Sequence, residues 1–160
     1  MATTKEYRLG EFTYPRGWFM IAESTELDTY KPVAVRFFGK DFALYRGRAT
    51  GRVVLLDAYC PHMKTHLAAP NNTSYVVVDG GGSNVEGDGI RCPYHGWRFR
   101  PDGVCAAIPS LVEDQAFEAN RIRVRSYPVR ESQGLVFVWM AADARNPSEP
   151  DHEPPLFPGA

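Results

Sequence analysis

Four residues in two short segments have the types and spacing of metal ligands. One segment reads Cys-Pro-His and runs from Cys60 to His62, and the other reads Cys-Pro-Tyr-His and runs from Cys92 to His95. Each segment holds one thiol followed two or three positions later by an imidazole. The proline after each cysteine restricts the loop backbone, so two similar loops can project their side chains toward a shared point.

This pairing resembles the Rieske iron–sulfur family, in which C-x-H and C-x-x-H loops hold a [2Fe-2S] cluster. By that resemblance Cys60 and Cys92 bind one iron, and His62 and His95 bind the other. Two thiolates and two neutral imidazoles leave the cluster formally neutral, whereas four thiolates make it dianionic, so the mixed set accepts an electron more readily. The resemblance implies electron transfer.

Zinc is the alternative use of the same residue types. Zinc fingers usually place two cysteines before two histidines. Here the order alternates, and the second segment continues into Gly96 and Trp97. The alternation favours a Rieske cluster over zinc or no metal.

Other prominent residues have simpler interpretations. We expect Trp18, Trp97 and Trp139 to fill the core rather than relay electrons, and Cys105 to be a small buried hydrophobe rather than a ligand. His66 follows His62 by four positions. We expect ligation by His62 and not by His66, with a functional role such as a surface contact near the cluster as the alternative for His66.

The resemblance covers roughly residues 10–142 and points to the N-terminal domain of Rieske non-haem iron oxygenases, in particular the ketosteroid hydroxylase and cholesterol desaturase group. The matching stretches are 14–19 (Tyr-Pro-Arg-Gly-Trp-Phe), 102–103 (Asp-Gly), 108–109 (Ile-Pro), 127–129 (Tyr-Pro-Val) and 134–139 (Gly-Leu-Val-Phe-Val-Trp). The chain lacks the extra cysteines and hydroxyl donors that respiratory relatives place at the cluster. The absence of these donors predicts a reduction potential in the lower part of the Rieske range of about −150 to +300 mV.

The spacing between the segments departs from the family. Residues 63–91 separate His62 from Cys92, where many relatives have little more than half that length. The predicted insert, about 71–89, combines a strand-like stretch at 74–79 with a glycine-rich loop at 80–89. We expect a structural hairpin there, with a partner-binding loop as the alternative.

Short apolar and β-branched runs separated by turn residues predict an all-β fold. The expected strands are 17–22, 33–38, 42–46, 52–58, 74–79, 97–100, 121–129 and 135–140, with hairpin connections at 39–41 and 131–134 and a helical turn at 111–117. With the resemblance, the expected fold is a Rieske-type antiparallel β sandwich with a small cluster-binding subdomain formed by two loops. The predicted Rieske domain is 1–146, its cluster-binding subdomain is about 58–105, and 147–160 is a Pro-rich tail or linker.

Composition narrows the class of protein. The chain has 160 residues, 44% of them hydrophobic, and a formal net charge of −1, which fits one domain and gives no field that would attract nucleic acid. No apolar run is long enough for a membrane span, and residues 1–10 lack the apolar core of a secretory signal. Three cysteines argue against a disulfide framework and for reduced thiols, so we expect a cytoplasmic protein.

An oxygenase of this family also needs a mononuclear iron held by two histidines and a carboxylate. Only His66 and His152 remain beside the cluster ligands, so we expect no catalytic mononuclear site in this chain. The sequence predicts the Rieske domain of an oxygenase, which takes electrons from an NAD(P)H-dependent reductase or ferredoxin and passes them to a mononuclear-iron catalytic domain or oxygenase subunit. The alternatives are a free-standing Rieske ferredoxin or accessory electron carrier, expected to be monomeric, and a cluster-bearing regulatory module.

Overall fold

The computed structural model describes residues 15–68, 83–110, 119–141 and 149–158. The strands, with one short 3₁₀ helix, are β1 (Gly17–Glu23), η1 (Ser24–Leu27), β2 (Val33–Phe37), β3 (Lys40–Arg46), β4 (Val53–Asp57), β5 (Val85–Glu86), β6 (Gly89–Arg91), β7 (Arg98–Phe99), β8 (Cys105–Ala107), β9 (Ser126–Tyr127), β10 (Val129–Ser132) and β11 (Leu135–Met140). The all-β prediction is confirmed. In the parts of the chain that the structure describes, no helix has the length and apolar character needed to cross a bilayer.

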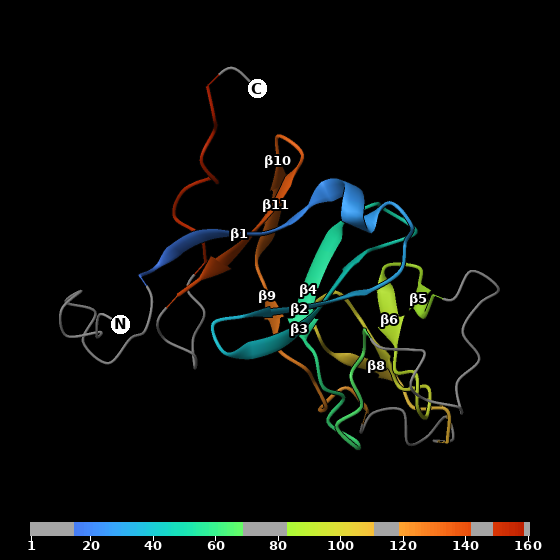
Figure 1. Ribbon diagram of the computed structural model, residues 1–160. Helices are drawn as coiled ribbons and strands as arrows, with labels where there is room; N and C mark the ends of the chain where they lie inside the picture. Colours follow the sequence, from blue (N-terminus) through green and yellow to red (C-terminus); the bar gives the residue numbers. More distant parts are fainter. Residues whose placement is uncertain (1–14, 69–82, 111–118, 142–148, 159–160) are drawn as a thin grey trace.

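The strands form three antiparallel sheets, which Figure 1 shows one after another across the molecule. Sheet 1 has the order β1-β11-β10, sheet 2 the order β2-β3-β4-β9, and sheet 3 the order β5-β6-β7-β8. Sheet 2 is the middle layer. Sheets 1 and 2 make the predicted sandwich, and sheet 3 belongs to the predicted cluster-binding subdomain.

Strand β3 shows why sheet 2 lies in the middle. Successive side chains of a strand point to opposite faces of its sheet. Phe42 and Leu44 join the core that sheet 2 shares with sheet 1, whereas Ala43 and Tyr45 join the core that it shares with sheet 3. Because both faces are covered, the stretch from Phe42 to Tyr45 is buried without the usual alternation.

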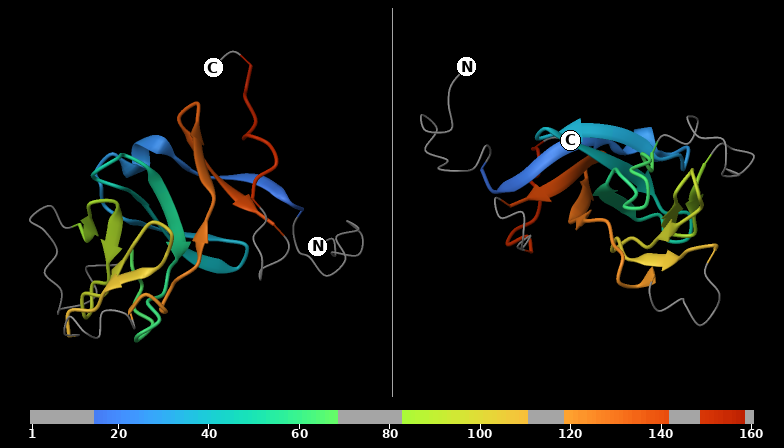
Figure 2. Two further views of the ribbon diagram at one scale, coloured as in Figure 1. Left: turned by 180° about the vertical axis from the view of Figure 1, so that it is seen from behind. Right: turned by 90° about the horizontal axis from the view of Figure 1, so that it is seen from below.

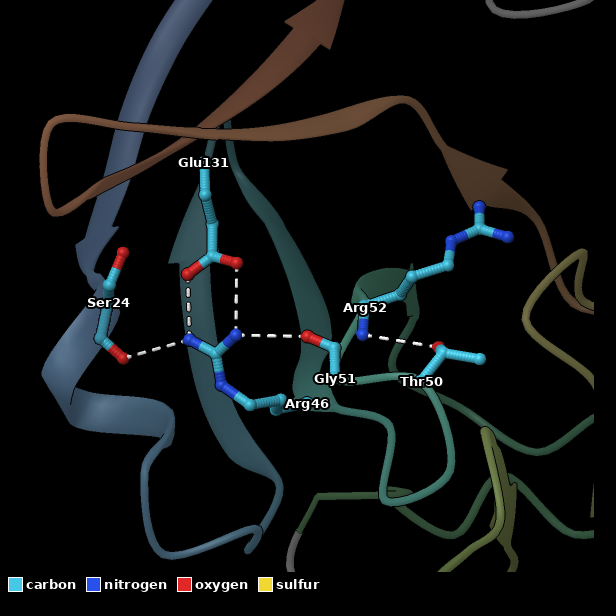
Figure 3. A network of polar contacts seen from close by, with 6 residues as sticks. All are labelled: Ser24, Arg46, Thr50, Gly51, Arg52 and Glu131. Atoms are coloured by element: carbon cyan, nitrogen blue, oxygen red, sulfur yellow. Dashed lines mark hydrogen bonds and ion pairs between the residues drawn. The ribbon is translucent and has the colours of Figure 1, made fainter.

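An ion pair also fastens sheet 1 to sheet 2 (Figure 3). Arg46 of β3 donates from its two terminal nitrogens to the two carboxylate oxygens of Glu131 on β10, at 2.9 and 2.7 Å. The same guanidinium donates to the carbonyl oxygens of Gly51 (3.0 Å) and Ser24 (3.3 Å). A bidentate pair of this kind fixes both distance and orientation.

Two tight turns differ from the sequence prediction. The β2–β3 connection is the two-residue turn Phe38–Gly39, because Phe37 already pairs with Lys40; we predicted 39–41. Likewise Gln133–Gly134 alone joins β10 to β11. All four turn residues have positive φ, as a type I′ turn requires.

The predicted strands at 17–22, 33–38, 42–46, 52–58, 97–100 and 135–140 are confirmed within two residues at each end. The single strand expected at 121–129 is wrong: β9 ends at Tyr127 and β10 begins at Val129, because Pro128 between them has no N–H to donate. The glycine-rich stretch predicted as a loop contains β5 and the first residue of β6. The strand expected at 74–79 and the helical turn at 111–117 lie outside the described residues.

The described part of the predicted tail, residues 149–158, runs along sheet 1 (Figures 1 and 2). The Trp18 indole N–H donates to the carbonyl oxygen of His152 (2.7 Å). The side chain of Gln133 donates to the carbonyl of Phe157 (3.0 Å) and accepts from its N–H (2.7 Å). These contacts dock the segment on the domain; that 147–160 is a tail or linker to another domain stays a prediction.

Candidate metal centre

The first ligand loop follows β4 and closes on itself. The Cys60 N–H donates to the carbonyl oxygen of Thr65 (2.9 Å), and the Lys64 N–H donates to the carbonyl oxygen of Cys60 (2.8 Å). Just outside this loop, the Leu67 N–H donates to the carbonyl of Ala58 (2.7 Å). The chain therefore leaves sheet 2, makes one tight six-residue turn and returns alongside itself.

The second ligand loop, between β6 and β7, repeats the same hydrogen bonds. The Cys92 N–H donates to the carbonyl oxygen of Trp97 (2.6 Å), and the Gly96 N–H donates to the carbonyl oxygen of Cys92 (3.1 Å). In both loops the cysteine accepts from the residue four positions on and donates to the residue five positions on. That fourth residue has positive φ in each loop, 60° at Lys64 and 78° at Gly96, so the two loops share one backbone conformation.

The two loops lie at one end of the molecule in both Figure 1 and the left view of Figure 2. Their contacts bring the four predicted ligands together in pairs. Cys60 and Cys92 are 1% and 2% exposed and lie in the core between sheets 2 and 3. His62 and His95 are exposed, and their ring centroids are 4.9 Å apart. The thiols therefore point inward and the imidazoles outward.

Backbone N–H groups near the two sulfurs favour the thiolate form of each cysteine. The two sulfurs are in hydrogen-bond contact, which lowers the pKa of Cys92 and, together with burial, raises the pKa of Cys60. The backbone N–H of His62 points to the Cys60 sulfur, and those of Tyr94 and His95 point to the Cys92 sulfur; each lowers the pKa of its cysteine. Hydrogen bonds to the charged form stabilise it.

The donor set fits a binuclear cluster. Within residues 15–68, 83–110, 119–141 and 149–158, no three His, Cys, Asp or Glu side chains converge as ligands of a single metal ion. A Rieske cluster takes only two side chains on each iron, thiolates on one and imidazoles on the other. The grouping of Cys60 with Cys92 and of His62 with His95 matches that requirement.

Trp97 has a role that the sequence interpretation missed. Its ring lies parallel to the ring of His62, with centroids 4.6 Å apart and an angle of 6° between the planes. It is partly buried against the core between sheets 2 and 3. Trp97 therefore supports the side chain of a predicted ligand and does more than fill the core; its position directly after His95-Gly96 was the signal available.

The remaining candidates behave as structural residues. His66 is half-buried: its Nδ1 accepts from the Ala68 N–H (3.1 Å), and its ring packs against Tyr59 at 5.3 Å between centroids. Burial lowers the pKa of His66. Cys105 is fully buried in the same core as the ligand cysteines, as predicted for a small hydrophobe.

Comparison with known proteins gives a family. The model of the Rieske [2Fe-2S] domain matches residues 17–128. Cholesterol 7-desaturase nvd 1 of Ciona intestinalis is 36% identical over 84% of this chain, which covers 25% of that protein. A probable 3-ketosteroid-9-alpha-monooxygenase, oxygenase component, of Rhodococcus rhodochrous is 35% identical over 79% of the chain and 27% of its own length. This chain therefore spans about a quarter of these relatives.

Solved structures agree on the fold. Dicamba monooxygenase, crystallised with non-haem iron and dicamba, aligns with a TM-score of 0.61 and 27% identity over 88% of this chain and 37% of that one. The oxygenase of carbazole 1,9a-dioxygenase, in its reduced complex with ferredoxin, aligns with a TM-score of 0.61 and 24% identity over 79% of this chain and 29% of that one. Both matches support the predicted Rieske-type fold.

Proposed function

The chain belongs to the Rieske [2Fe-2S] domain family, and on this basis we propose that it transfers electrons through a [2Fe-2S] cluster held by Cys60, His62, Cys92 and His95. The observation that carries the proposal is the pair of matching loops, which bury two thiols in contact and expose two imidazoles. When bound, such a cluster supplies a one-electron redox couple.

The site has a buried end and an exposed end, which different residues form. Cys60 and Cys92 anchor the buried end, where the backbone N–H groups of the loops stabilise their negative charge. His62 and His95 form the exposed end. Trp97 holds the plane of the His62 ring by stacking on it, so the ring keeps one orientation for a ligand nitrogen.

The exposed end is the side on which a redox partner approaches. Met63 and Tyr59, beside His62 in the chain, are 58% and 44% exposed and offer apolar contact area of the kind found at transient interfaces. An NAD(P)H-dependent reductase or ferredoxin is the proposed electron donor. The ferredoxin complex of the carbazole oxygenase supports a ferredoxin as this class of partner.

We place the chain as the Rieske domain of a sterol- or ketosteroid-type oxygenase, with a mononuclear iron in another domain or subunit as the electron acceptor. The desaturase and monooxygenase relatives, of which this chain spans about a quarter, support that placement.

A free-standing carrier is the second candidate and a regulatory module the third. A reading frame that continues past residue 160 into two histidines and a carboxylate favours the first, and a stop codon favours the second. Bleaching by a reductase with NAD(P)H separates carriers from a regulatory module. A cytoplasmic location stays a prediction.

The deciding experiment is electron paramagnetic resonance of the dithionite-reduced protein with iron and sulfide analysis. We expect the mixed-ligand signal in the unaltered protein and its loss in His62→Cys and Cys92→Ser. Cys105→Ala and His66→Gln are matched controls, one buried cysteine and one nearby histidine outside the ligand set, and should keep the signal. A colourless protein that contains zinc would overturn the proposal.

A further inference from the structure

A buried carboxamide links the two ligand loops. Asn84 is 2% exposed and lies directly before β5. Its side-chain nitrogen donates to two backbone carbonyl oxygens, that of Leu67 at 2.8 Å and that of Arg91 at 2.7 Å. Both protons of the amide group are therefore used.

The two accepting carbonyl groups belong to the stems of the two loops, that is, to the residues that flank each loop. Leu67 follows the first loop, and its own N–H pairs with Ala58 on the opposite stem. Arg91 directly precedes Cys92, and its N–H donates to the backbone carbonyl of Asn84 at 2.8 Å. One residue thus hydrogen-bonds to both stems.

The stems belong to different sheets. The first loop leaves sheet 2 after β4, whereas the second connects two strands of sheet 3. Strand pairing therefore fixes each loop within its own sheet but does not fix the separation between the two loops. The Asn84 amide crosses that boundary, and the ligand pairs also form across it, since each pair takes one residue from each loop.

We infer that Asn84 is a positioning residue for the metal centre: it sets the separation of the two loops and so of Cys60 from Cys92 and of His62 from His95. This inference rests on the proposed function. Removing the amide takes this donor from the buried Leu67 carbonyl and from the part-buried Arg91 carbonyl, and the loops relieve that cost by moving apart. The expected consequence is a cluster that is held less tightly and in a less uniform geometry.

The test compares Asn84→Leu with the control Ser83→Ala. Ser83 is the neighbouring buried polar residue, 3% exposed, and its hydroxyl donates to the carbonyl of Tyr30 (2.6 Å), away from the loops. Iron release to a chelator and the linewidth of the reduced electron paramagnetic resonance signal are measured on both. We expect release about tenfold faster in Asn84→Leu, equal to about 1.4 kcal/mol, with a broadened signal. Ser83→Ala should match the unaltered protein in both.

Equal release rates and linewidths in Asn84→Leu and the unaltered protein would overturn the inference, as would equal changes in both variants. If Asn84→Leu does not fold, Asn84→Asp serves instead, because it keeps the shape and places an oxygen where the donor was.

A cluster-free assay separates this inference from the proposed function. In a Cys105→Ala background, diamide oxidises the Cys60 and Cys92 thiols to one disulfide and is itself reduced to the hydrazine. We expect disulfide formation to be slower with Asn84→Leu, because the thiols are no longer held in contact. A protein that binds no iron and sulfide but shows this difference would refute the proposed function and keep the positioning role; an unchanged rate would refute the positioning role.

Discussion

The shared backbone of the two ligand loops predicts opposite effects for two substitutions at the same loop position. Lys64 and Gly96 both have positive φ, 60° and 78°, a region that a residue with a side chain occupies at a cost of roughly 1–2 kcal/mol. Lys64→Gly removes that strain, and Gly96→Ala introduces it. A Cβ at Gly96 would also lie 3.1 Å from the Arg91 side chain and 3.3 Å from Pro109.

A change in the conformational entropy of the unfolded chain partly offsets both changes in strain. Glycine gives the unfolded chain more freedom, and a Gly-to-Ala change recovers about 0.4–1 kcal/mol. The net backbone effect is that Gly96→Ala lowers the free energy of unfolding by up to about 1.6 kcal/mol and that Lys64→Gly raises it by up to about 1.6 kcal/mol. The close contacts of a Cβ at Gly96 with Arg91 and Pro109 add to the cost of Gly96→Ala. Lys64 is exposed, so its replacement removes little packing.

Urea unfolding of the cluster-free protein measures both changes, with Lys64→Ala as the control. Alanine meets the same strain as lysine, so the control should stay within about 0.5 kcal/mol of the unaltered protein. A neutral Gly96→Ala, or a Lys64→Gly that destabilises by more than the control, would show that the loops do not share one conformation.

Three further predictions concern the Arg46–Glu131 ion pair, the glycine at position 103 and the reduction potential. Glu131→Gln should lower the free energy of unfolding by about 1–2 kcal/mol at neutral pH. This is the contribution of a charged hydrogen bond, reduced because the Glu131 carboxylate is 34% exposed. Because the hydrogen bond from Arg46 lowers the pKa of Glu131 below 4.5, this stabilisation is complete above that pH and declines as the pH falls further; a difference independent of pH in denaturant titrations would contradict the assignment. Gly103→Ala should cost roughly 2–5 kcal/mol in thermal unfolding, since φ is +81° and a Cβ would clash with the carbonyl of Val124; a melting temperature within a degree of the original would refute the clash. A redox titration should place the midpoint in the lower part of the range of about −150 to +300 mV, and a value near its top would overturn the prediction from missing hydroxyl donors.

The sequence predicted most reliably those features that local residue types determine. The apolar run from Leu135 to Met140 became β11 with unchanged ends. The cysteines and histidines were found by type and spacing, and the structure brings them together. Both signals are local, because apolar runs and ligand order can be read without knowing which strands become neighbours.

Features that depend on neighbouring strands were not predictable. Strands β5 and β6 have two and three residues in a stretch where glycine masks any apolar pattern, and they are strands because they pair. The turns at Phe38 and Gln133 place non-glycine residues at positive φ, without the Asn-Gly signal that usually marks such turns. Asn84 stood in the same glycine-rich stretch, and its contact with Leu67 exists only once the first loop lies beside sheet 3.

The layering of the sheets explains why substitutions at the metal centre can be interpreted. The core between sheets 1 and 2 contains Leu44 and Val138 but none of the four proposed ligands, whereas Cys60 and Cys92 belong to the core between sheets 2 and 3. Alternate residues of β3 and β4 contribute to the two cores, so a disturbance at the loops reaches the sandwich through the backbones of these strands. Packed cores respond mainly to changes in their own volume. A ligand variant such as Cys92→Ser should therefore lose the cluster while the sandwich stays folded, so loss of the spectroscopic signal reports ligation rather than unfolding.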